Sequence, residues 1–189
     1  MPSQLMPFNE EQFDRCALWL VKHLGKPPTQ YDLIKFHVMT DVYHVLCCGS
    51  QIIGGPLEKW KWGPVVPRAF RRLKHETERF ERGQKIGPLE VHAGPGNIYE
   101  FTALDGAAVD DDEFSNTELS AMEEALKVVE LPFDQSQQFF HEPNASFMGK
   151  AWFEVSDGSP IDWNNVVDAY DIQHRSDHGH IKALIAIGA

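Results

Sequence analysis

The sequence predicts a mainly α-helical protein of the α+β class, folded as a single compact domain of about six helices with one small β-hairpin. Apolar residues recur at helical spacing in several segments that begin with capping residues. One pair of apolar segments flanks a tight glycine-proline turn. The 189 residues are enough for one domain with its own core. We expect this domain to span residues 1–171, followed by a C-terminal tail of unknown role over 172–189.

The first helix is expected to begin after Asn9. Asn9 is a favourable N-cap, and Phe8 can pack on Phe13 across the first turn. Apolar residues then recur at helical spacing until Gly25 and two prolines end the pattern.

A second helix is expected from a cap formed by Thr29 and Asp32 as far as Gly49. Its residues are apolar on nearly every side, which is typical of a helix buried at the centre of a domain. The segment QIIGGPLEKWKWG, which follows Gly49, is too rich in glycine and proline for a helix. We expect a loop or a short irregular hairpin there.

Pro64 and Pro67 lead into a third predicted helix that ends at about Phe80. Val66, Phe70 and Leu73 belong to its apolar face, which continues through Thr77. Cationic residues occupy the opposite face: Arg68, Arg71, Arg72, His75 and Arg79.

Downstream, LEVHA and NIYEFTA flank the turn GPG and predict the β-hairpin. Ser115 and Glu118 form a capping box for a further helix that carries Leu119 and Met122. Two shorter helices are expected near 136–141 and 162–170.

The charge of the chain is uneven. The formal net charge is −11, but nine Lys or Arg and three Glu between Lys59 and Lys85 give that segment +6 and leave −17 elsewhere. Nucleic-acid binding by the whole chain is therefore disfavoured, although the cationic helix alone could contact DNA. No apolar run is long enough to span a bilayer and no secretory signal is visible, so we expect a cytoplasmic protein with reduced cysteines.

Four polar residues share one stripe of the second helix: His37, Asp41, His44 and Cys48. Their ligand types suit zinc or iron, but one helix rarely closes a metal site, so we favour a polar seam in a buried helix. His174, His178 and His180 raise the same choice, and a polar connector is the favoured interpretation. We expect no metal and no cofactor.

Trp60 and Trp62 lie two residues apart, so in an extended segment they face the same side. Core packing is the favoured role for at least one of them. Tryptophan beside arginine is also the composition of protein-binding hot spots. The partner-binding residues expected from this pattern are Trp60, Trp62, Arg68, Arg71 and Arg72.

Several of these residues together resemble the signature of the Panacea domain, the SocA-like antitoxin family. The resemblance covers roughly residues 10–170. Lys59, His37, Val38 and Cys48 differ from the residues usual in the family. The positions that carry the resemblance are Lys35, Asp41, His44, Gly49, Ile52, Gly54, Trp62, Gly63, Pro64 and Val65, then the segment LSAMEEAL, Ser136, Phe140, His141, Trp152 and Ile161.

The resemblance implies a helical antitoxin-like module with no enzymatic activity, found also in prophages and mobile elements. Family members neutralise a protein toxin encoded by a neighbouring gene, either by direct binding or as an adaptor that delivers the toxin to a cytosolic protease. From the residues alone we keep one alternative, a small metal-dependent hydrolase that uses His37, Asp41, His44 and His141.

Overall fold

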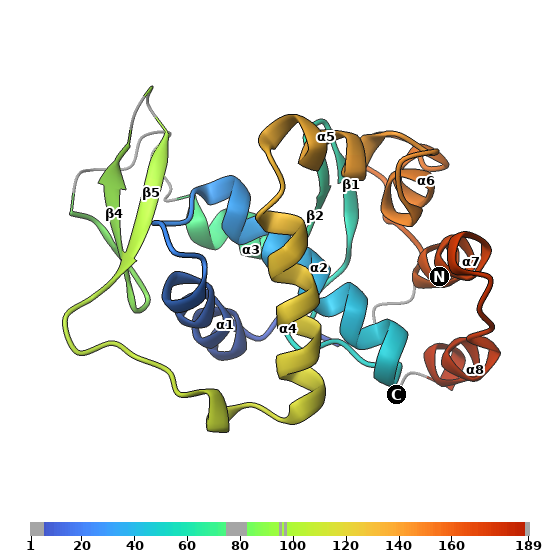
Figure 1. Ribbon diagram of the computed structural model, residues 1–189, viewed down its shortest axis with the longest axis horizontal. Helices are drawn as coiled ribbons and strands as arrows, with labels where there is room; N and C mark the ends of the chain where they lie inside the picture. The colour runs from blue at the N-terminus through green and yellow to red at the C-terminus, as the bar shows by residue number, and fades with distance from the viewer. Residues whose placement is uncertain (1–5, 75–82, 95, 97, 188–189) are drawn as a thin grey trace.

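The computed structural model describes residues 6–74, 83–94, 96 and 98–187, and it is mainly helical. Helix α2 (Gln30–Cys48) runs through the middle of the molecule, and α4 (Asn116–Val129) packs along it (Figure 1). The predicted capping box of Thr29 and Asp32 begins α2, and Gly49 ends it in a left-handed conformation. Because neighbours cover α2 on nearly all sides, its apolar residues form the centre of the core.

Helix α1 (Glu10–His23) begins as predicted. The Asn9 side chain accepts hydrogen bonds from the backbone amides of Glu11 and Gln12. The rings of Phe8 and Phe13 lie 5.6 Å apart, which confirms the expected contact across the first turn.

Two antiparallel sheets replace the single predicted hairpin. The expected hairpin is present as β4 (Leu89–Ala93) and β5 (Tyr99–Ala103), but β3 (Lys85–Ile86) adds a third strand at the edge of β4. The prediction missed β3 because a strand of two residues carries no alternation. The second sheet pairs β1 (Glu58–Trp60) with β2 (Gly63–Val65). β1 lies in the segment for which a loop or irregular hairpin was expected, whereas β2 extends past that segment through Pro64 and Val65, where the approach to the third helix was expected.

Helix α3 (Pro67–Leu73) follows β2 directly and begins at a proline, as predicted. Residues 75–80 of the predicted helix, including His75, Thr77, Arg79 and Phe80, lie outside the described residues. The acidic run contains a short 3-10 helix (Asp111–Glu113), and α4 starts at the expected capping box of Ser115 and Glu118.

The prediction of about six helices was too low, because the described residues contain eight α-helices. The two short helices expected near 136 and 162 are α5 (Phe133–His141) and α7 (Trp163–His174). The two that were missed are α6 (Phe147–Phe153) and α8 (Gly179–Ile187), which are too short to show a clear helical period.

Residues 172–187 do not form a separate tail. The expected boundary at 171/172 falls inside α7, and α8 folds back to contact α2. A Cβ atom at Gly49 would lie only 2.7 Å from Cδ1 of Leu184. The glycine at the end of α2 therefore allows α8 to pack closely against it.

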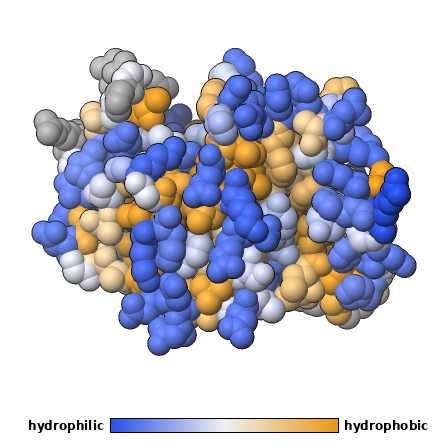
Figure 2. Space-filling view, in the orientation of Figure 1, coloured by the Kyte–Doolittle hydropathy of each residue, from blue (hydrophilic) through white to orange (hydrophobic). Residues whose placement is uncertain are grey.

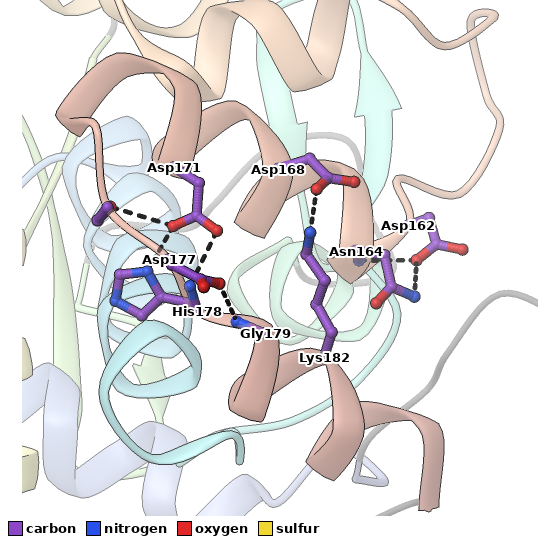
Figure 3. A network of polar contacts seen from close by, with 9 residues as sticks. Asp162, Asn164, Asp168, Asp171, Asp177, His178, Gly179 and Lys182 are labelled. Carbon is purple, nitrogen blue, oxygen red and sulfur yellow. Dashed lines mark hydrogen bonds and ion pairs between the residues drawn. The ribbon is translucent and has the colours of Figure 1, made fainter.

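A network of polar contacts joins α7 to α8 (Figure 3). The Asp171 carboxylate accepts hydrogen bonds from the Ser176 hydroxyl and the His178 backbone amide, at 3.1 and 3.0 Å, and also pairs with the His178 ring. Lys182 on α8 pairs with Asp168 on α7. We predicted that His174, His178 and His180 belong to a polar connector. The structure shows an ordered turn between α7 and α8, held by Asp171 at the end of α7.

We expect Asp171→Asn to loosen α8 at neutral pH. Burial alone would raise the pKa of Asp171, but the hydrogen bonds from His178 and Ser176 outweigh it and hold that pKa below its usual value of 3.8. A carboxylate whose pKa is lower in the folded state stabilises the fold when the pH is above the usual pKa. This stabilisation disappears as the pH falls through the folded-state pKa. Hydrogen exchange of the α8 amides should be faster in the variant at pH 7, and the difference should vanish in acid. A difference that persists at pH 2 would contradict this assignment, and exposed Asp112→Asn is the control.

Hydrophilic residues cover much of the face shown in Figure 2, and hydrophobic residues are visible between them, including near the middle of this face. Within the described residues, no helix has both the length and the apolar character needed to cross a membrane. Cys16, Cys47 and Cys48 are free thiols.

Candidate functional site

The turn between β1 and β2 presents a tryptophan to solvent. Trp60 pairs with Gly63 across the hairpin, so Lys61 and Trp62 form its two-residue turn. Gly63 has a φ of +95°, a left-handed value that favours glycine. The Trp62 side chain is 56% exposed. Because an indole of this size is normally buried, this exposure marks the turn as a candidate binding surface.

Three side chains from three helices hold the hairpin in place, and we call them the hairpin supports. Lys35 on α2 donates a hydrogen bond to the Pro64 carbonyl at 2.9 Å. Trp152 on α6 donates from Nε1 to the Trp60 carbonyl at 3.2 Å, and Nε2 of His141 on α5 lies 3.2 Å from the Lys61 carbonyl oxygen. All three supports are among the residues that carry the family resemblance.

Lys59, in the middle of β1, is held by further contacts. Lys59 is buried, its ammonium group lies 4.0 Å from the centre of the Trp152 ring, and it donates to the Val155 carbonyl at 2.7 Å. Its backbone pairs with Ser159 and Gly158. The hairpin is therefore fixed at both of its edges, and the exposed turn projects from a rigid base.

Asp41 and His44 organise the turn that follows α2. The buried Asp41 carboxylate accepts hydrogen bonds from the amides of Ile52, Ile53 and Gly54, at 2.7 to 2.9 Å, and from the Gln51 side chain at 3.0 Å. His44 donates from Nδ1 to the Ser50 carbonyl at 2.7 Å. Burial raises the pKa of Asp41, and these hydrogen bonds act in the opposite direction. The favoured interpretation of a satisfied polar seam is confirmed for both residues.

His37 belongs to the same seam. Its ring is buried against Phe13, and its two nitrogens lie against the carbonyl oxygens of Leu33 and Phe13. Burial lowers the pKa of His37 to about 4, while the contacts with the Leu33 and Phe13 carbonyl oxygens act in the opposite direction.

The stripe does not converge on a metal position. Among the described residues, no group of three His, Cys, Asp or Glu side chains is arranged to hold an ion, and this includes the turn with His174, His178 and His180. His141 contacts the hairpin and the Trp152 ring, so it does not join His37, Asp41 and His44 as the hydrolase alternative requires. The geometry gives that alternative no support.

Arg72, one of the expected partner-binding residues, forms ion pairs within the protein. Its guanidinium group binds both carboxylate oxygens of Asp14 at 2.9 and 2.6 Å, and Glu10 at 2.8 Å, so it joins α3 to α1. Helical spacing places Arg72 on the same face as Arg68 and Arg71, and it does not show which of the three arginines is ion-paired. Arg68 and Arg71 are exposed and form no ion pair within the described part of the chain.

Trp60 separates two hollows on this surface. A groove of about 450 Å³ lies on one side, with Arg68, Arg71 and Phe8 in its wall. A hollow of about 280 Å³ lies on the other side and includes Trp62. Both predicted tryptophans border this second hollow, and the half-buried Trp60 packs on the ring of Phe70, 5.0 Å away.

Three residues of α2 that border the smaller hollow were not predicted from the sequence: Gln30, Tyr31 and Ile34. Tyr31 precedes Lys35 by four residues and therefore lies on the same face of α2. That spacing is the signal that could have identified Tyr31 once Lys35 was chosen.

Scans against protein-family models, curated proteins and solved structures found no match to this chain. The resemblance to the Panacea domain therefore stays a prediction that depends on the residues quoted for it.

Proposed function

We propose that this chain is an antitoxin-like protein-interaction module that binds a protein toxin encoded by a neighbouring gene. The exposed Trp62 on a hairpin held by three buried or half-buried supports carries this proposal. Such an indole offers a large contact area, and its rigid base lowers the entropy lost on binding. Arg68 and Arg71 are exposed in the groove on the other side of Trp60, where they can contact acidic groups of the partner.

The residues quoted for the family resemblance give the proposal its second support, because several of them converge on this hairpin and the turn before it. In the proposed role the module acts in the cytoplasm, by direct binding of the toxin or as an adaptor for a cytosolic protease. The test is growth of cells that express the neighbouring open reading frame, with and without this protein. Restored growth is expected. A neighbour that is harmless by itself would contradict the antitoxin role.

We expect Arg68→Glu with Arg71→Glu to abolish this rescue and to weaken binding of the purified toxin at least about tenfold, because charge reversal at an interface replaces attraction by repulsion. Both side chains are exposed, so the thermal midpoint should change by less than about 3 °C. Lys127→Glu with Arg175→Glu makes the same charge change at exposed positions elsewhere. Equal loss of binding in both double variants would show that total charge matters and not this surface.

The two modes of neutralisation predict different toxin levels. Direct binding should leave the lifetime of the toxin unchanged or longer, whereas delivery to a protease should shorten it. A pulse-chase measurement of the toxin, with and without this protein, separates these modes.

A further inference from the structure

The smaller hollow beside Trp60 has the size of one large residue. Its volume is about 280 Å³, which is below the range of about 300–1,000 Å³ typical of small-molecule sites. The N-terminal half of α2, the β1–β2 hairpin and α3 surround it. Its apolar wall consists of Tyr31, Ile34, Trp60, Trp62, Val65 and Phe70.

A buried lysine amine lies in this apolar wall. Lys35 borders the hollow and is only 2% exposed. Its ammonium group donates to the Pro64 carbonyl, and it otherwise lies 5.3 and 4.8 Å from the ring centres of Tyr31 and Phe140. In the described residues no carboxylate pairs with it. A buried ammonium group without a counter-ion is costly, and burial accordingly lowers the pKa of Lys35 well below its usual value.

A second polar group at the same hollow has no hydrogen-bond partner among the described residues. The side-chain nitrogen of Gln30 is buried and makes no hydrogen bond within the described part of the chain. Lys61, in the exposed turn, adds another donor at the rim. These groups offer N–H donors, and the group that satisfies several N–H donors at once is an anionic oxygen.

We infer that this hollow receives the C-terminal residue of the partner protein, with a bulky apolar side chain against the aromatic wall and the terminal carboxylate at Lys35 and Gln30. A C-terminal residue carries both groups on one Cα atom, so it fits a hollow the size of one residue. An internal acidic residue would need a neighbouring residue to supply the apolar group. The inference rests on the proposed function, since it names the part of the toxin that the surface recognises.

The direct test uses short peptides in place of the unidentified toxin. The first is acetyl-Gly-Ser-Gly-Phe with a free carboxylate, the second is the same peptide with a C-terminal amide, and the third ends in Gly with a free carboxylate. Binding is measured by tryptophan fluorescence and by NMR of the 15N-labelled protein. We expect the first peptide to bind at least about tenfold more tightly than the other two, since a charge-assisted hydrogen bond is lost in one and the apolar contact in the other.

Substitutions then assign the preference to Lys35. Lys35→Met should remove the difference between the free acid and the amide, whereas Lys61→Met, at the rim of the same hollow, should retain most of it. Should Lys35→Met fail to fold, the NMR signal of the Lys35 ε-carbon in the native protein gives the answer, because it should move with the acid and not with the amide. Equal binding of acid and amide, or an unmoved signal, would overturn the inference.

A further ligand separates a partner's C-terminus from a free small acid. If 3-phenylpropionate binds as tightly as the first peptide, the hollow is a site for a small carboxylic acid and the inferred partner is wrong. The proposed function fails separately. If the neighbouring gene is harmless, the antitoxin role is contradicted, and the peptide result is unaffected. If the toxin is neutralised but the peptides do not bind, only the recognition of a C-terminus is contradicted.

Discussion

Asp41→Ala is expected to lower the free energy of unfolding by about 3–5 kcal/mol, because it leaves several buried donors without an acceptor. The wild-type carboxylate accepts from three consecutive backbone amides and from the Gln51 side chain, and it is 1% exposed. Those donors cannot all turn to solvent, since residues 51–55 are themselves buried. Urea unfolding followed by tryptophan fluorescence measures the loss.

Asp41→Asn tests the same explanation more gently. Asparagine retains one acceptor oxygen but places an NH₂ group where backbone amides point, so a loss of about 2–3 kcal/mol is expected. Asp105→Ala, at an exposed position, serves as the control and should stay within about 0.5 kcal/mol of the wild type. A loss of less than about 1 kcal/mol for Asp41→Ala would mean that water replaces the carboxylate and that the turn does not depend on it.

The helix starts could be predicted from the sequence because caps are local. Asn9, Thr29 and Ser115 each accept hydrogen bonds from amides within three residues, so a short window of sequence contains the whole interaction. The buried character of α2 could also be predicted, since a helix that is apolar on nearly every side is typically buried.

The hairpin supports could not be predicted from physical reasoning on the sequence. Trp152 reaches Trp60 across 92 positions and His141 reaches Lys61 across 80, and no periodicity links residues so far apart. The resemblance to a family selected His141 and Trp152, but it did not indicate what they contact. The pairing of Arg72 with Asp14 was missed for the same reason, because it depends on how α3 packs on α1.

The placement of the supports explains how the hairpin can be packed between helices and still present Trp62 to solvent. Lys35, His141 and Trp152 hold carbonyl groups of the hairpin, so the apolar side chains of residues 60–65 need not all point into the core to keep the hairpin in place. Trp62 is thereby free to remain at the surface, and Lys35 stays buried beside the hollow that it borders.

Gly54→Ala is the second substitution for which we expect a large effect, a loss of about 3 kcal/mol or more. Gly54 has a φ of +81°, and a Cβ atom there would lie 2.3 Å from the Pro7 carbonyl oxygen and 3.1 Å from that of Met6. The contacting atoms belong to the backbone, so a change of side-chain rotamer cannot relieve the clash. The neighbouring Gly55 amide donates to Met6 and the Asn9 amide donates to Ile53, so displacing this segment also breaks backbone hydrogen bonds.

Gly106→Ala separates the clash from the cost of the backbone conformation. Gly106 has a φ of +78°, and a Cβ atom there would meet nothing within 4 Å, so its substitution should cost only about 1 kcal/mol. Equal losses in the two variants would contradict the predicted clash.

Because Asp41 and Gly54 act on the same turn, the loss in the double variant Asp41→Ala with Gly54→Ala should be smaller than the two single losses combined. Full additivity would mean that the carboxylate and the segment at residues 6–9 stabilise the turn independently.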